Sequence, residues 1–347
     1  MATATRRSSR LSSLAESISS SAGSTQTPNS RKRKQSPVAT PSTPPQKRQR
    51  PAKLPAATPT PSAVGLMAHA TSATKKPTNP MVARLADPQT TNATLLSPET
   101  SRVITHMNVA AIPSRLPQPS TTTATLLEEA NAHLIKVDER MRPLVENNFC
   151  RVFSPEGLAE AIDPFESLAS GIISQQVSGA AAKSIKAKFV ALFEGDRRFP
   201  HPSDVAPLPI ERLRTAGLSQ RKAEYIKGLA EKFVSGELSA QMLNDARYEE
   251  VLRHLIAVRG LGKWSVEMFA CFGLKRMDVF SLGDLGVQRG MAAFVGKDVA
   301  KLKNKGGKWK YMSEKEMLEL SEKFAPYRSL FMWYMWRVEE TDISTME

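Results

Sequence analysis

The distribution of aromatic residues is the feature that most limits what this chain can fold into. All 22 aromatic residues lie at or after Phe149 in the 347-residue sequence, whereas 16 of the 24 prolines precede residue 121. A segment without aromatic side chains buries too little apolar surface to offset the entropy of ordering its backbone. We therefore predict a disordered basic Ser/Thr/Pro-rich arm over residues 1–121 and one globular domain over residues 122–347.

The net charge divides near the same point. The chain has a formal net charge of +14, and residues 1–120 hold 16 Lys and Arg against 3 Asp and Glu, which leaves the rest with only +1. Two basic clusters, residues 31–34 and 47–50, resemble a bipartite nuclear import signal for import receptors. The alternative is a solvated charge run that adds DNA affinity. Arginines among Ser and Ala near the N-terminus also fit a mitochondrial transit peptide.

Several classes of protein are excluded by composition. The two cysteines, Cys150 and Cys271, lie far apart in apolar surroundings, so neither a disulfide framework nor a cysteine metal site is expected. The five histidines show no ligand spacing, so we expect no metal and no required cofactor. No apolar run is long enough to span a membrane.

Apolar residues recur at helical spacing from Thr125 onward, and no alternating period indicates a strand. The fold class predicted from this pattern is all-α. Asp163 precedes a proline and is expected to cap a helix, and Ser178 and Ser219 are expected to cap two more. Between the first two of these helices lie Gln175 and Gln176, which fit an ordinary surface loop or a side chain that enters a base stack.

Gly260-Leu261-Gly262 forms a tight turn between two apolar helical segments. Glycines permit positive torsions and let a ligand approach the backbone, and the amides that open the next helix make an anion site. A DNA phosphate would fit there, with Lys263 adding a positive charge. The alternative is a tight connection without a ligand.

A single carboxylate, Asp284, follows Gly262 by 22 positions and opens another helix. A carboxylate at a helix N-terminus is usually a cap. The same anion would stabilise the oxocarbenium-like state of N-glycosidic bond hydrolysis and orient or deprotonate water. One carboxylate suffices when the leaving base is already cationic.

These residues resemble the helix-hairpin-helix, Gly/Pro-rich, Asp superfamily of DNA glycosylases, and within it the bacterial inducible 3-methyladenine DNA glycosylase and its eukaryotic relatives. The resemblance runs from about residue 122 to 340 through five ordered blocks, which are DPFESLASGIISQQVSGAAA, AGLSQRKAEYIKGLA, VRGLGKWSVEMF, GLKRMDVFSLGDLGVQRG and FAPYRSLFMWYMWR. It implies two helical subdomains with the active-site cleft between them.

The resemblance also implies residue roles. Asp284 matches the catalytic aspartate, and Gln176 matches the wedge that fills the space left by a flipped nucleotide. The DNA phosphate clamp, which often also holds a monovalent cation (Na or K) on main-chain carbonyls, matches Gly260, Leu261, Gly262 and Lys263. The base pocket matches Trp264, Tyr327 and Met268, with core packing as the alternative for its aromatics, whereas Trp333 and Trp336 are expected mostly in the core.

The sequence departs from the family pattern at several positions. Bifunctional members have a Schiff-base lysine where this chain has Trp264, and the cysteines of iron-sulfur relatives are absent after Cys271. The small sheet domain of the bacterial enzyme is also not expected, because no strand pattern is found. A lysine-rich insert, residues 297–310, either contacts phosphates or is merely solvated.

The expected protein is thus a nuclear, monomeric, monofunctional glycosylase that hydrolyses alkylated purines from double-stranded DNA. It would leave an abasic site for a downstream endonuclease. A non-catalytic helix-hairpin-helix DNA-binding module and a glycosylase with lyase activity for oxidised bases are the alternatives. The sequence does not select among 3-methyladenine, 7-methylguanine, ethenoadenine and hypoxanthine as lesions.

Overall fold

Helices dominate the part of the chain that the structure describes. The computed structural model describes residues 83–98, 100–105, 121–193, 198–304 and 306–338. The α-helices are α2 (Leu126–Val137), α3 (Met141–Asn147), α4 (Pro155–Ala159), α5 (Pro164–Ser174), α6 (Gly179–Val190), α7 (Pro202–Val205), α8 (Ile210–Arg214), α9 (Gln220–Val234), α10 (Ala240–Asp245), α11 (Tyr248–Ile256), α12 (Lys263–Met268), α13 (Leu285–Phe294), α14 (Val299–Leu302), α15 (Glu314–Glu322) and α16 (Arg328–Met335). A 3-10 turn, η1 (Arg151–Phe153), precedes α4, and a π-helix, η2 (Phe269–Gly273), continues α12.

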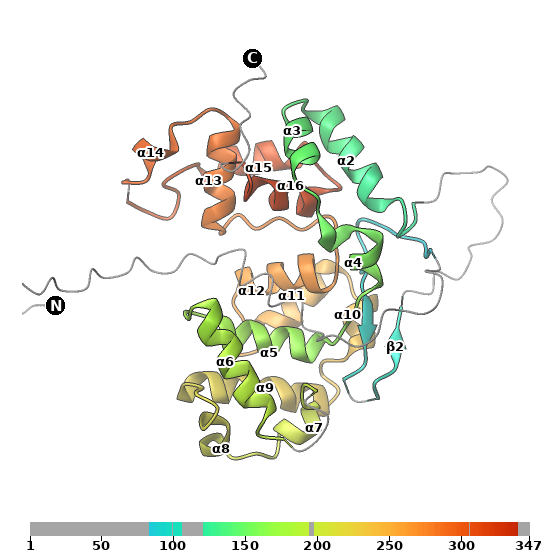
Figure 1. Cartoon of the computed structure of the whole chain (residues 1–347), viewed down its shortest axis with the longest axis vertical. Helices are drawn as coiled ribbons and strands as arrows, with labels where there is room; N and C mark the ends of the chain where they lie inside the picture. Colours follow the sequence, from blue (N-terminus) through green and yellow to red (C-terminus); the bar gives the residue numbers. More distant parts are fainter. Residues whose placement is uncertain (1–82, 99, 106–120, 194–197, 305, 339–347) are drawn as a thin grey trace, which may run out of the picture. The chain divides into compact units, whose positions relative to one another are not determined.

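The described helices build two hydrophobic cores. The first core combines α2 to α4 with α13, α15 and α16, and the second core combines α5 to α11. Met268 and Phe272 belong to the first core, whereas Val266 and Phe269 belong to the second. Figure 1 accordingly shows two groups of helices with α11 and α12 between them. The expected division into two helical parts is present, and α12 with η2 is shared by both.

The predicted helix starts are confirmed. The Asp163 carboxylate accepts hydrogen bonds from the amides of Phe165 (2.8 Å) and Glu166 (3.1 Å), with Pro164 in the first turn of α5. Ser178 and Ser219 cap α6 and α9 in the same way, through the amides of Ala181 and Lys222 respectively. These caps satisfy amides that have no partner within the helix.

The prediction that the chain has no strands is wrong. Three short strands, β1 (Thr94–Leu96), β2 (Val103–Ile104) and β3 (Ala161–Ile162), form a sheet in the order β2-β1-β3. β1 pairs antiparallel with β2, with Leu95 opposite Ile104, and parallel with β3, with Leu95 opposite Ile162. Strands of two or three residues are too short to display an alternating pattern.

The predicted domain boundary at residue 121 also lies too late. Leu95 is fully buried in the second core, although it belongs to the segment assigned to the arm. Asn92 donates from its backbone amide to the carbonyl of Leu274 (3.1 Å), and the amide of Met277 donates to the carbonyl of Pro88 (3.1 Å). The described residues that were assigned to the arm therefore hydrogen-bond to residues 274–277, which precede Asp284 in the chain. The two basic clusters lie outside the described residues.

Among the described helices, none combines the length and the apolar character needed to cross a bilayer.

Candidate active site

Asp284 is held at the first turn of α13. It is the N-cap residue, and its Oδ1 accepts a hydrogen bond of 2.8 Å from the amide of Val287. The residue is only 1% exposed. The capping function predicted from sequence is confirmed, and the cap contact involves only the Oδ1 oxygen of the carboxylate.

Two indoles complete the surroundings of the Asp284 carboxylate. Trp264 Nε1 donates to Oδ2 at 2.7 Å, and Trp336 Nε1 donates to Oδ1 at 3.0 Å. Indole N–H groups only donate, so both contacts require acceptor oxygens on Asp284. Because the donors come from α12 and from the end of α16, the carboxylate is fixed by three separate elements.

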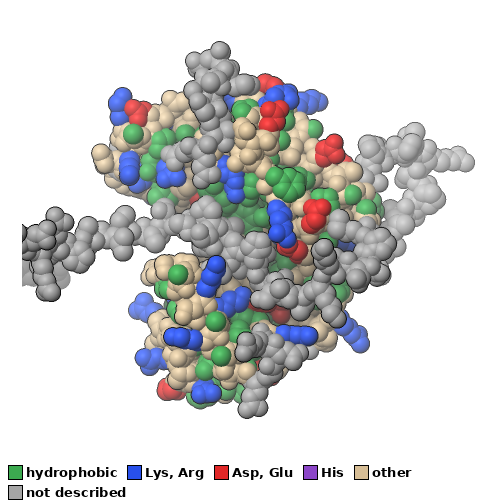
Figure 2. Space-filling model, in the orientation of Figure 1, with side chains coloured by type: hydrophobic (Ala, Val, Ile, Leu, Met, Phe, Trp, Pro, Cys, Tyr) green, Lys and Arg blue, Asp and Glu red, His purple; other side chains and the backbone are tan. Residues whose placement is uncertain are grey.

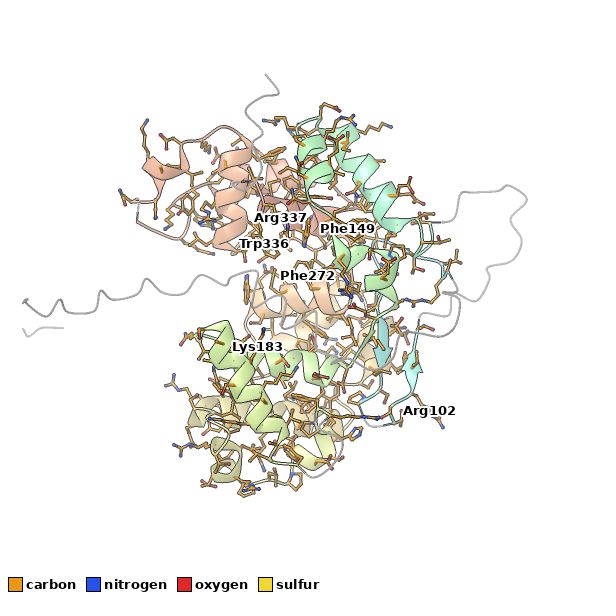
Figure 3. The ribbon with its side chains drawn as sticks, viewed as in Figure 1. Arg102, Phe149, Lys183, Phe272, Trp336 and Arg337 are labelled. Atoms are coloured by element: carbon orange, nitrogen blue, oxygen red, sulfur yellow. The ribbon has the colours of Figure 1, made fainter. Side chains whose placement is uncertain are left out.

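Trp336 was expected mostly in the core, and it packs against the first core but also reaches Asp284. Its ring is partly exposed and packs on Phe272, with ring centroids 5.6 Å apart (Figure 3). Gly286 makes room for this ring, because a Cβ there would come within 2.9 Å of Trp336 Cδ1. Helical periodicity does not indicate the direction in which the last side chain of a helix points.

No contact joins Tyr327 to Asp284 among the described residues. Tyr327 precedes α16 and packs against the first core, whereas Trp336 follows that helix. The ring of Tyr327 lies 5.2 Å from that of His133, and burial raises the pKa of Tyr327. Met268 is fully buried in the first core, and the base-pocket role expected for both residues stays a prediction.

The two hairpin glycines have different structural roles. Gly260 has a φ of +94°, and a Cβ there would approach the ring of Tyr225 to 2.3 Å. Gly262 has an ordinary φ of −87°, and a Cβ would meet nothing within 4 Å. Leu261 is 5% exposed and packs in the second core. Thus Gly260 and Leu261 shape the turn, and Gly262 leaves the backbone open to a ligand.

The amides at the start of α12 are available as donors. Within the described part of the chain, no acceptor is recorded for the backbone amides of Lys263 and Trp264. The Lys263 side chain is 65% exposed, and its Nζ lies 3.8 Å from Glu267 Oε1. This arrangement suits an anion approaching Gly262.

The glutamine pair is divided between two tasks. Gln175 donates from Nε2 to the carbonyl of Gly260 at 2.9 Å, which ties the turn after α5 to the hairpin. Gln176 is exposed and has a φ of +56°. A left-handed conformation is strained for a residue with a Cβ, by about 1 kcal/mol or more. Gln176 directly follows the C-cap of α5, where a left-handed residue commonly ends a helix, so its wedge role stays a prediction.

Comparisons with known proteins identify the superfamily of the chain. A family model described as HhH-GPD superfamily base excision DNA repair protein matches residues 169–305. The DNA-3-methyladenine glycosylase of Saccharomyces cerevisiae is 36% identical over 240 residues, which cover 62% of this chain and 80% of that protein. The chain belongs to the HhH-GPD superfamily.

Two further matches come from Schizosaccharomyces pombe. Its DNA-3-methyladenine glycosylase 1 is 30% identical over 216 residues, covering 61% of this chain and 87% of the relative. The solved structure of its 3-methyladenine DNA glycosylase in complex with abasic DNA aligns with a TM-score of 0.49 at 26% identity, covering 62% of this chain and 98% of that chain. The HhH-GPD match ends at residue 305, before Trp336.

Glu267 is a buried acid that sequence reasoning missed. It is 3% exposed, and its Oε2 accepts a hydrogen bond of 2.6 Å from Ser281 Oγ. Burial raises the pKa of Glu267, and the nearby Asp284 acts in the same direction, against the contacts of Ser281 and Lys263. A sequence signal did exist, because Glu267 follows Trp264 by three positions and therefore shares its helix face.

Two hollows on the described surface lie away from Asp284. One of about 620 Å³ lies beside Tyr225 and Arg259, and one of about 440 Å³ lies beside Trp309 in the lysine-rich insert. The cleft expected between the subdomains therefore stays a prediction.

In the lysine-rich insert, Lys308 and Lys310 lie over the rings of Trp309 and Tyr311. Figure 2 shows Lys and Arg side chains spread over the visible face rather than gathered into one patch.

Proposed function

We propose that the chain is a monofunctional DNA-3-methyladenine glycosylase of the type II class, a hydrolase that acts on the N-glycosyl bonds of alkylated purines in double-stranded DNA. The observation that carries this proposal is a buried Asp284 fixed by two partly exposed indoles, close in sequence to an open hairpin. The names of the HhH-GPD relatives support the same substrate class.

In this proposal Asp284 acts on the sugar. As the glycosidic bond breaks, positive charge develops on the deoxyribose, and a fixed carboxylate stabilises it while orienting or deprotonating the attacking water. A methylated purine is already cationic, so it leaves without a general acid. The electron-rich faces of Trp264 and Trp336 would favour such a cationic base over a neutral one.

The base must leave the stack before this reaction can occur. We assign the wedge to Gln176, whose exposed and strained position is tied to the hairpin through its neighbour Gln175. The hairpin would hold a phosphate of the same strand through the amides of Lys263 and Trp264, with the Lys263 ammonium adding charge.

A monovalent cation at the hairpin is a further part of the proposal. Among the described residues, no donor is recorded for the carbonyls of Arg259 and Leu261, whereas the carbonyl of Gly260 accepts from Gln175. Neutral carbonyl oxygens fit Na or K. Such an ion would add positive charge near the phosphate, and no other cofactor is required by the proposed reaction.

Trp264 supports hydrolysis without strand cleavage. Its indole N–H donates a hydrogen bond to Asp284, and the side chain has no amine that could form a Schiff base. The product would then be an abasic site that a separate endonuclease must cut. We further propose a nuclear monomer whose basic clusters are read by import receptors, a location supported by the sequence of those clusters alone.

The proposal is tested with a DNA substrate carrying several methylated, ethenylated and deaminated purines. We expect released 3-methyladenine, detected by mass spectrometry, and strands that break only after alkali treatment. Borohydride should trap no covalent complex. DNA binding without any released base would instead support a non-catalytic module, and a trapped complex would support a lyase.

A further inference from the structure

Glu267 lies on the same face of α12 as Trp264, directly behind the proposed site. Trp264 reaches the Asp284 carboxylate at 2.7 Å, and Glu267 reaches Ser281 at 2.6 Å. Ser281 is fully buried. One short helix thus makes two separate contacts with the segment that carries the catalytic candidate.

Ser281 begins the turn that ends at Asp284. The Asp284 amide donates to the Ser281 carbonyl at 3.3 Å, and Asp284 then caps α13. The Ser281 hydroxyl is therefore the side-chain anchor of this turn, and Glu267 is its acceptor. If Glu267 were absent, Trp264 would still contact Oδ2, but the turn would lose its tether to α12.

Glu267 also faces the hairpin. Its other oxygen, Oε1, lies 3.8 Å from Nζ of Lys263, the exposed lysine at the start of α12. The side chain consequently joins the residue expected near a DNA phosphate to the turn that presents Asp284. Burying a carboxylate is costly unless it is hydrogen-bonded, and the contact with Ser281 is what offsets this cost for Glu267.

We propose that Glu267 is a positioning residue for base hydrolysis: it anchors the Ser281 to Asp284 turn to α12 so that the carboxylate meets the sugar. This inference rests on the proposed glycosylase function. The essential element is an acceptor oxygen for Ser281, which a glutamine also provides. Misplacing a reacting group by about 1 Å can cost roughly 100-fold in rate, which sets the scale of the effect.

The test is single-turnover release of 3-methyladenine at saturating enzyme, together with affinity for DNA containing an abasic analogue. Glu267→Ala and Ser281→Ala should each release base about 10- to 100-fold more slowly than wild type, with affinity within about threefold. Glu267→Gln should restore the rate to within about threefold. The double variant should be no slower than Glu267→Ala, because both changes remove the same contact.

The matched control is Glu166→Ala. Glu166 is also a buried glutamate, paired with Lys186 at 2.8 Å, but it lies at the end of α5 away from Gln175. It should lower thermal stability without lowering the single-turnover rate of the folded enzyme.

Equal rates for Glu267→Ala and wild type would overturn the proposal, as would a glutamine variant as slow as the alanine variant. If Glu267→Ala fails to fold, Ser281→Ala and Glu267→Gln still decide the question. Absence of base release by the wild-type protein would instead refute the glycosylase function itself.

Discussion

The Asp284 carboxylate is held by donors that are far apart in the sequence. Trp264 and Trp336 precede and follow it by 20 and 52 positions, and the Val287 amide belongs to its own helix. Three donors from separate elements restrict both the position and the rotation of the side chain. Such preorganisation lowers the reorganisation needed when charge develops on the substrate.

At this scale the structure predicts a contrast between two aromatic residues. Trp336→Phe removes the N–H that reaches Oδ1 but keeps an aromatic ring beside Phe272, and we expect base release to slow about 10- to 100-fold. A hydrogen bond to a charged group contributes about 1.5–3 kcal/mol, which gives this range.

Tyr327→Phe is the matched change, because it also removes one polar group from an aromatic side chain. Its rate should equal that of wild type, as Tyr327 has no recorded contact with Asp284 among the described residues. Single-turnover kinetics check both variants. Slower release by Tyr327→Phe than by Trp336→Phe would contradict this site.

The buried Glu267 should make stability depend on pH. Burial raises its pKa above 4.5, so the folded protein favours the neutral acid. The stabilising contribution is complete below that value and is lost as the pH rises through the raised pKa. Glu267→Gln cannot ionise, so its Tm relative to wild type should increase as the pH rises above 4.5. A difference that shrinks over this range would show that the folded protein prefers the anion.

At the scale of elements, the hairpin separates a structural glycine from an accessible one. Gly260→Ala would force a Cβ into the ring of Tyr225 at a φ of +94°. We expect it to destabilise the protein by about 2 kcal/mol or more and to weaken DNA binding with it.

Gly262→Ala should behave differently. Its Cβ meets no neighbour and its φ is ordinary, so Tm should stay within about 2 °C of the wild-type value. DNA affinity should still fall, because the methyl group occupies the approach to the α12 amides. Thermal melts and binding titrations distinguish the two variants, and equal Tm losses would refute this division of roles.

The sequence predicted those parts of the site that depend on local rules. Asp163, Ser178 and Asp284 cap helices because short polar side chains before an apolar run satisfy free amides. Trp336 and Glu267 were not predicted, because periodicity identifies a buried face but not the tertiary partner of each side chain. Tyr327 was assigned to the base pocket by resemblance, and that role stays a prediction.

At the scale of the whole molecule, residues 84–97 link the small sheet to the segment before Asp284. Arg276 donates to the carbonyl of Gln89 at 3.0 Å, and Asn92 donates from Nδ2 to the carbonyl of Lys275 at 3.2 Å. The composition of this stretch resembles that of the preceding residues, so counts of aromatics and prolines could not reveal its fold. Its order depends on pairing with β3 and on contacts with residues 274–277.

Two truncations test this link. Removing residues 1–82 should leave Tm unchanged, whereas removing residues 1–121 should lower it by roughly 5 °C or more, since a buried strand and several hydrogen bonds are lost. Differential scanning calorimetry on both proteins gives the comparison. Equal Tm values for the two truncated proteins would show that the globular domain begins at residue 122, as the sequence predicted.

The most direct test of the account is Asp284→Asn, which keeps an acceptor oxygen for the α13 cap and removes the negative charge. The measurement is release of 3-methyladenine from methylated DNA, with binding to abasic-analogue DNA measured in parallel. We predict release at the background rate with binding retained. Undiminished release by the variant would contradict the assignment of Asp284 as the catalytic residue.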